Sequence, residues 1–228
     1  MDIVFTFKFD PHTKNRQLIY SLRSIEKHLK GNIGTVFVIG ADPELNNVIH
    51  IPATDLKSAA INIKDKLLIA CNHPGISEDF LYVADDHYLV ADVDIESYPV
   101  YSSGTLANLS RTQRGAYKQN VIETMKYIPS GKNYNVHSPI IYNKQKLKDI
   151  IEETDWQPFG LLIKSLYCNR LELRGHEMSD CKISRDISPT EMKSRIANRP
   201  FFSTGRESTM RYLKQFMDEL YPIPSKYE

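Results

Sequence analysis

The chain has 228 residues and carries 29 Lys and Arg against 28 Asp and Glu, a net charge of +1. This length allows one sizeable hydrophobic core, and the near-zero net charge argues against a general nucleic-acid-coating protein. The cysteines (Cys71, Cys168 and Cys181) are odd in number and lack zinc-site spacing, which indicates reduced thiols in a cytoplasmic protein. No signal-peptide pattern follows Met1 and no apolar run is long enough to span a bilayer, so we expect no membrane association.

The first half of the chain alternates predicted strands and helices. Apolar, β-branched runs predict strands at 2–7, 35–40, 47–51 and 80–84, and helical spacing of apolar residues predicts helices at 18–29 and 60–71. This order is typical of an α/β fold with a parallel or mixed central sheet flanked by helices. Ligands of such sheets bind beyond the carboxyl ends of the strands.

The second half is predicted to be mainly helical. Amphipathic spacing predicts helices near 117–128, 147–151, 162–167 and 210–220, with an extended run at 133–142 and a strand plus loop within 171–183. Thr204 and Glu207 match a capping box at the start of the last helix. With no repeat and no linker, we expect one domain over 1–228.

Two adjacent carboxylates, Asp85 and Asp86, directly follow the predicted strand at 80–84. Adjacent carboxylates at a strand end repel each other and resist desolvation, and a divalent cation such as Mg²⁺ or Mn²⁺ would offset both effects. The alternative is a solvated turn between two strands, because Asp is a common turn residue. His87 should point to the opposite face from Asp86 if the strand continues.

Charge is distributed unevenly between the two halves. Residues 1–110 carry 9 Lys and Arg against 14 Asp and Glu, a net −5, and residues 111–228 carry 20 against 14, a net +6. The segment 193–214 is especially basic. An acidic metal-binding half joined to a basic half fits a polyanionic ligand, either nucleotide phosphates or a nucleic-acid backbone. A solvated face of clustered lysines and arginines is the alternative.

Several segments resemble the Stealth family of sugar-phosphate transferases, which act on capsules and in lysosomal targeting. The segments are Tyr20–Leu29, Val36–Gly40 and Asp79–Asp86, and 135–139 with 143–144 resembles the family's later His-x-Pro block. Ala84 stands where the family has Asn before its Asp-Asp pair. The similarity spans about residues 15–150 in order and spacing. The whole chain, including 201–205, also resembles compact glycosyltransferases of tailed bacteriophages, some of which modify hydroxymethylated DNA bases.

The Stealth resemblance implies a GT-A-like, Rossmann-type nucleotide-sugar fold, with residues 1–110 as the nucleotide-sugar and metal-binding half and 111–228 as the acceptor-binding half. In GT-A enzymes a short acidic motif binds Mn²⁺ or Mg²⁺, which bridges the donor's two phosphates. By this resemblance Asp86 is the direct metal ligand, and Asp85 binds the ribose or a metal-bound water. The end of the first strand (Thr6, Lys8 and Asp10) and the loop after Ile39 would hold the nucleoside.

Four further residues are candidates, each with a structural alternative. Arg23 occupies a position of the family block, but a structural ion pair is an equal alternative. Lys66, on the helix before the metal-binding strand, could meet phosphates or be an ordinary exposed lysine. His137 could act as general base, metal ligand or phosphate contact, or as a structural histidine. Asp180 is a candidate base for the acceptor, with a plain surface loop as the alternative.

These features lead to one main functional hypothesis and two alternatives. The main one is a metal-dependent glycosyltransferase that moves a sugar from a nucleotide-diphosphate sugar to an acceptor hydroxyl, with hydroxymethylated bases of bacteriophage DNA as the expected acceptor. Reaching such a base would require flipping it out of the duplex. The alternatives are a Stealth-type hexose-1-phosphate transferase acting on a polysaccharide and a non-catalytic nucleotide-sugar-binding protein.

Overall fold

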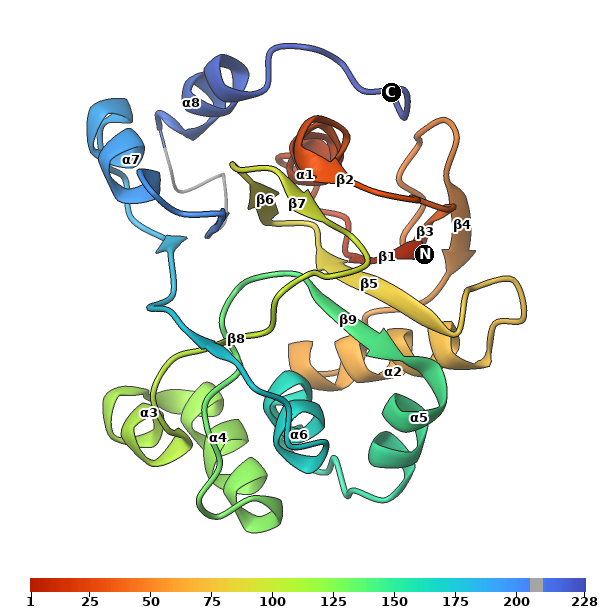
Figure 1. The fold of residues 1–228 in the computed structure, drawn as a ribbon, viewed down its shortest axis with the longest axis vertical. Helices are drawn as coiled ribbons and strands as arrows, with labels where there is room; N and C mark the ends of the chain where they lie inside the picture. The colour runs from red at the N-terminus through yellow and green to blue at the C-terminus, as the bar shows by residue number, and fades with distance from the viewer. Residues whose placement is uncertain (206–210) are drawn as a thin grey trace.

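The computed structural model describes residues 1–205 and 211–228. At its centre is a five-stranded sheet in the order β4-β3-β1-β5-β9 (Figure 1). β1 pairs in parallel with β3 and β5, β3 pairs in parallel with β4, and β9 runs antiparallel to β5. The strands are β1 Asp2–Phe7, β3 Val36–Gly40, β4 Ile49–Pro52, β5 Asp79–Ala84 and β9 Ile140–Asn143. The predicted α/β class and mostly parallel sheet are therefore confirmed.

Helices cover both faces of this sheet (Figure 1). Ile3, Phe5 and Phe7 of β1 pack in one apolar cluster with α1, and Val4, on the opposite face, belongs to the cluster formed with α2, α5 and α6. This division follows from the two-residue period of a strand, which sends alternate side chains to opposite faces. The helices are α1 Arg16–His28, α2 Ala59–Asn72, α5 Lys144–Glu152 and α6 Ile163–Arg170.

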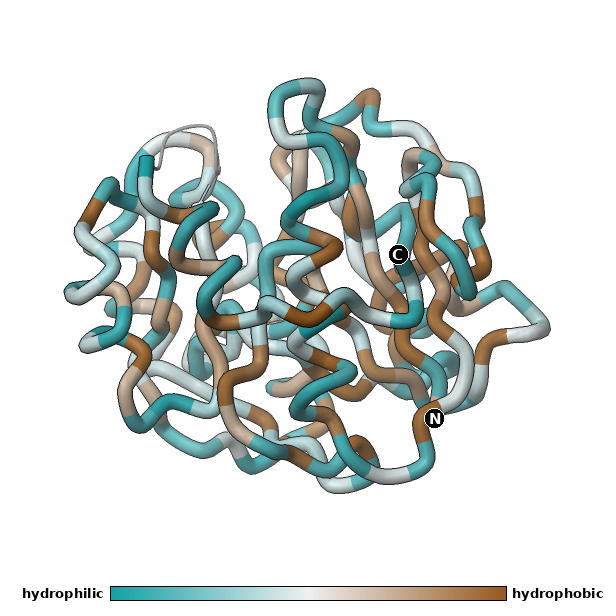
Figure 2. Tube along the Cα trace, turned by 90° about the horizontal axis from the view of Figure 1, so that it is seen from above, coloured by the Kyte–Doolittle hydropathy of each residue, from teal (hydrophilic) through white to brown (hydrophobic). Residues whose placement is uncertain are grey.

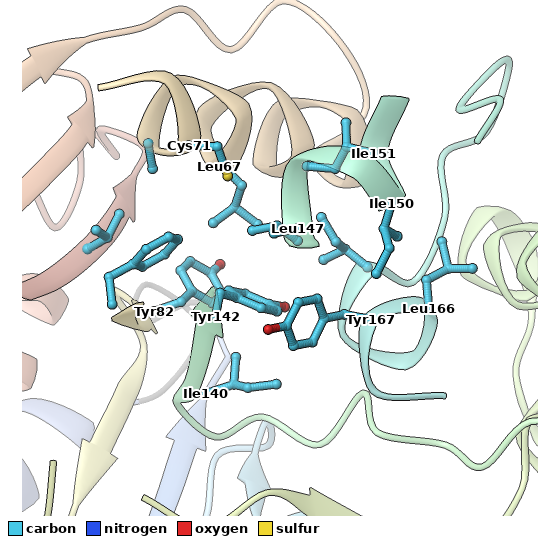
Figure 3. Close-up of a cluster of buried hydrophobic side chains, with 14 of the residues drawn as sticks. Leu67, Cys71, Tyr82, Ile140, Tyr142, Leu147, Ile150, Ile151, Leu166 and Tyr167 are labelled. Atoms are coloured by element: carbon cyan, nitrogen blue, oxygen red, sulfur yellow. The ribbon is translucent and has the colours of Figure 1, made fainter. Parts of the chain in front are cut away.

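The apolar cluster between the sheet and helices α2, α5 and α6 has more buried side chains than the others, and Figure 3 shows part of it. Leu67 of α2, Leu147 of α5 and Leu166 of α6 are all 0% exposed and meet the aromatic rings of β5 and β9. Tyr142 of β9 lies edge-on to Tyr167, with ring centroids 4.8 Å apart. Truncation of any of these leucines to alanine should lower the free energy of unfolding by about 2–5 kcal/mol.

A smaller unit packs beside the main sheet. β6 (His87–Leu89) directly follows the acidic pair and pairs antiparallel with β12 (Phe201–Thr204), which in turn pairs with β11 (Lys182–Ile183). Two helices, α7 (Pro189–Ile196) and α8 (Leu213–Leu220), join these strands in a separate apolar cluster. The acidic pair therefore lies at the junction of this unit and the main sheet.

Figure 2 shows hydrophilic and hydrophobic residues alternating along the outer coils of the chain, as expected for amphipathic segments. Several shorter elements complete the part of the chain that is described. These elements are β2 Leu29–Lys30, β7 Val93–Asp94, β8 Tyr101–Ser102, α3 Leu106–Thr112, α4 Gly115–Tyr127 and β10 His176–Glu177. None of the helices in the described ranges combines the length and hydropathy needed to cross a membrane.

The strands and helices predicted for the first half are confirmed, but the predicted capping box is wrong. Thr204 ends β12 and is fully buried, and its Oγ1 accepts a hydrogen bond from Gln17 Nε2 at 3.0 Å. The last helix begins at Leu213. The two other residues of that prediction, Glu207 and Met210, lie outside the described residues.

Candidate functional site

A cavity of about 670 Å³ opens at the carboxyl ends of β1 and β5. The strand register explains its position, because Thr6 of β1 lies opposite Ala84, the last residue of β5. The other walls come from α2, the start of α4, the start of α6, the start of β11 and the end of β12. The predicted site residues that line it are Thr6, Lys8, Lys66, Asp85, Asp86 and His137.

The acidic pair forms a turn between β5 and β6. The Asp86 carboxylate lies 3.2 Å from Lys182 Nζ, and the Asp86 carbonyl accepts a hydrogen bond from the backbone N–H of Thr204 at 3.3 Å. Burial and the neighbouring charge of Asp86 raise the pKa of Asp85 to about 7. Lys182 thus pairs with Asp86, and no ion pair of Asp85 is found among the residues that the structure describes.

His87 lines the same cavity, so the expectation that it faces away from Asp86 is wrong. The strand alternation stops at the Asp85–Asp86 turn, and His87 Nε2 lies 3.9 Å from an Asp86 oxygen. The Ala84 N–H points to His87 Nδ1 at 3.4 Å, which leaves the imidazole proton on Nε2. Burial, and to a smaller extent the nearby charge of Lys164, holds the pKa of His87 well below its usual value. His87 is therefore a neutral donor.

His137 and Asp180 form a hydrogen-bonded dyad. The Asp180 carboxylate accepts two hydrogen bonds from His137, one from Nδ1 at 2.5 Å and one from the backbone N–H at 3.1 Å. Burial alone would raise the pKa of Asp180, but the bonds from His137 outweigh it and lower that pKa below its usual value. An ionised carboxylate only accepts hydrogen bonds, so Nδ1 carries a proton, and in the neutral imidazole Nε2 is the nitrogen that can act as a base.

The dyad lies beside the acidic turn. The rings of His137 and His87 meet edge to face, with centroids 6.3 Å apart. His137 lines the cavity and its side chain is 31% exposed, so a ligand there can reach the imidazole, whereas Asp180 is not among the lining residues. The structure therefore brings together two sequence candidates that are 43 residues apart.

Lys66 is less available to a ligand than its position suggests. Its side chain is 3% exposed, and Nζ donates to the Phe7 carbonyl at 2.7 Å and to both oxygens of Asp55 at 2.8 and 2.9 Å. Lys66 thus ties α2 to the end of β1. Gly40 allows this close packing, since a Cβ there would lie 1.9 Å from the Phe7 carbonyl oxygen and 3.1 Å from Lys66 Nζ.

Asp10 and Arg23 do not line the cavity. Arg23 donates to the Glu228 carboxylate, from Nε at 2.8 Å, and to the Tyr221 carbonyl at 2.9 Å, so the structural ion pair is the arrangement found. Asp10 caps its own loop, accepting from the His12 N–H at 2.9 Å. The expected nucleoside loop after Ile39 is also outside the lining. The loop after β4 takes its place with Asp55 and Lys57.

Other lining residues were not singled out as site residues from the sequence. Gln17 Nε2 donates to the Gly205 carbonyl at 3.0 Å, and Asn135 Nδ2 donates to the Tyr117 hydroxyl at 2.8 Å. Lys182 and Lys164 bring cations to the acidic turn and to the His137 loop. The basic character of 111–228 was the only sequence signal for either lysine.

The carboxylates fit a divalent cation only as a shared site. Within the described residues, no group of three or more His, Cys, Asp or Glu is arranged to hold a metal ion. Asp85 and Asp86 offer two carboxylates, and Mg²⁺ in nucleotide enzymes is typically held by one or two carboxylates together with substrate phosphates. A cation here would need oxygen ligands from a bound diphosphate.

No protein-family model matches the chain, and no curated protein matches its sequence. The functional interpretation therefore depends on the geometry of this cavity.

Proposed function

We propose that the protein is a metal-dependent glycosyltransferase of the GT-A type that uses a nucleotide-diphosphate sugar. The observation that carries the proposal is the cavity at the carboxyl edge of the sheet. It places the Asp85–Asp86 pair next to a histidine that is already oriented by a carboxylate. An oriented base beside a carboxylate pair is the arrangement that transfer of a group from a diphosphate to a hydroxyl needs.

In this proposal the acidic pair and the His137–Asp180 dyad have different roles. Asp86, assisted by Asp85, would hold Mg²⁺ or Mn²⁺, which when bound supplies positive charge to the leaving diphosphate. Lys182, which otherwise neutralises Asp86, would contact the phosphates. His137 Nε2 would accept the proton of the acceptor hydroxyl, and Asp180 would stabilise the imidazolium that results.

For the acceptor we propose a hydroxymethylated base in DNA, with a bacteriophage as the source of the protein. Arg111, Arg114 and Lys118 flank the cavity-lining residues Ala116 and Tyr117 at the start of α4. No ion pair of these three cations with a carboxylate is found in the part of the chain that the structure describes. Cations on either side of cavity-lining residues suit a phosphate backbone, and their charge would steer a nucleic acid toward the site.

The test is nucleotide release by purified protein with Mn²⁺ and a panel of nucleotide sugars, with and without DNA containing hydroxymethylcytosine. We expect DNA-dependent release of a nucleoside diphosphate by the wild type and by the exposed-carboxylate control Glu96→Gln, and its loss in Asp86→Asn. Release of nucleoside monophosphate with glycan acceptors would instead indicate hexose-1-phosphate transfer. Donor binding that survives Asp86→Asn, without turnover by any variant, would indicate a binding protein.

A further inference from the structure

Lys164 is a buried cation in the wall of the cavity. It lies in the first turn of α6, and its residue is 7% exposed. Its position is unfavourable in two respects, because burial desolvates the ammonium and the first turn of a helix carries positive partial charge. Burial lowers the pKa of Lys164 to about 8. Such a position calls for a specific compensating contact.

The compensating contact is with the backbone on either side of His137. Lys164 Nζ donates to the Val136 carbonyl and to the Ser138 carbonyl, each at 2.5 Å. Between them the chain makes a tight three-residue turn, in which the Ser138 N–H donates to the Val136 carbonyl at 2.8 Å. Two carbonyl oxygens thus converge on one ammonium, an arrangement that their mutual repulsion would disfavour without the cation.

Asp180 acts on the same residue with the opposite charge. Its carboxylate holds the backbone N–H and Nδ1 of His137, whereas Lys164 holds the carbonyls of the two neighbouring residues. A loop without regular strand or helix structure is fixed in this way by two charged side chains from other segments. The result is one imidazole orientation, with Nδ1 on Asp180 and Nε2 left for the cavity.

We propose that Lys164 is a positioning residue for His137, holding the 136–138 turn in the conformation that lets Asp180 fix the imidazole. Its role is distinct from phosphate binding, because its donors are already directed to backbone carbonyls and, at 3.4 Å, to the Ser138 hydroxyl. The geometric part of this inference is independent of the reaction. Its kinetic part depends on the proposed glycosyltransferase function.

The direct test is nitrogen NMR of the histidine side chains in protein labelled with ¹⁵N-histidine, with the His137 signals assigned by His137→Gln. In the wild type we expect one His137 tautomer, protonated at Nδ1 and unprotonated at Nε2. Lys164→Met should give a mixture of tautomers or exchange-broadened signals. Lys146→Met, which removes an exposed lysine from α5, is the matched control and should leave the signals unchanged.

The kinetic test compares kcat and donor affinity in the same variants. Lys164→Met should lower kcat about 100-fold, the scale of a small misplacement of a catalytic group, while donor affinity changes little. Lys164→Gln keeps an amide N–H donor, so its kcat should lie between those of the wild type and Lys164→Met. It replaces Lys164→Met in the test if that variant does not fold. Because both residues act through His137, the effects of Lys164→Met and Asp180→Asn should be less than additive in the double variant.

The outcomes separate the two proposals. An unchanged His137 spectrum in a folded Lys164→Met protein would overturn the positioning role, and so would an unchanged kcat with any donor that the wild type uses. An inactive wild type with a perturbed Lys164→Met spectrum would overturn the proposed function and leave the positioning role supported.

Discussion

The two walls of the cavity are built in different ways. The acidic turn, Asp85–His87, is one continuous segment between β5 and β6, and the sheet hydrogen bonds of both strands fix it. The histidine loop, Val136–Ser138, pairs with no strand in the ranges 1–205 and 211–228 and is held by Asp180 and Lys164 from two other segments. The first wall should therefore tolerate loss of a side chain without moving. The second should lose its geometry when either charged partner is removed.

The largest expected effect is on the acidic turn. Asp86→Asn removes the proposed metal ligand but leaves the turn in place. We expect nucleotide release to fall about 10³-fold, which corresponds to ~4 kcal/mol of transition-state stabilisation. Steady-state release assays would measure this, and thermal unfolding should show no loss of stability. Activity within threefold of the wild type would exclude Asp86 as the ligand.

The next effect concerns the histidine loop. His137→Gln should lower kcat about 100-fold, the lower range for loss of a general base, while donor affinity measured by calorimetry stays the same. The partly exposed His137 contributes little to the core, so the melting temperature should change little. Equal losses from His137→Gln and from the control His12→Gln, at an exposed position away from the cavity, would contradict this role.

The pH dependence of stability tests the protonation of Asp85 in the acidic turn. The folded pKa of Asp85, about 7, lies above its value of 3.8 in an unstructured chain, so only the folded state binds this proton between those pH values. The contribution of Asp85 to the free energy of unfolding should therefore decrease as the pH rises from about 4 to about 7, by about 2 kcal/mol after allowance for partial exposure. Denaturant unfolding in EDTA should show this contribution as a difference between the curves of the wild type and Asp85→Asn that changes by this amount across the range, whereas the curve of Glu96→Gln should run parallel to that of the wild type. Parallel curves for all three proteins would contradict it.

The same contrast explains what could be predicted from the sequence. Asp85 and Asp86 adjoin a buried apolar strand, so both the strand and the polar break after it are visible as a local pattern. The contact between His137 and Asp180 depends on packing of separate segments. The Stealth resemblance supplied His137 and the fold class suggested Asp180, but neither indicated the hydrogen bond between them. Lys164 lies among the apolar residues that predicted α6, yet lysine is usually exposed, so nothing local indicated its burial. The Thr204 prediction failed because a buried strand end and a helix cap favour the same residue type.

The smallest effect is expected away from both walls. Arg23 belongs to a segment that resembles the Stealth blocks, but its partners are Glu228 and the Tyr221 carbonyl. Arg23→Gln should leave kcat within twofold of the wild type and lower the free energy of unfolding by about 1 kcal/mol or less. Parallel activity and denaturation measurements would check both values. A large loss of donor binding in this variant would place Arg23 in the functional site after all.

The pairing of β6 with β12 also has a consequence for the order in which a newly made chain can fold. All five strands of the central sheet lie within residues 2–143, so they leave the ribosome before Asp180, Lys182 and Thr204. The histidine loop is therefore synthesised before its carboxylate, and the acidic turn before its lysine. A nascent chain that ends before residue 180 has all five strands of the sheet but lacks the residues that complete the cavity.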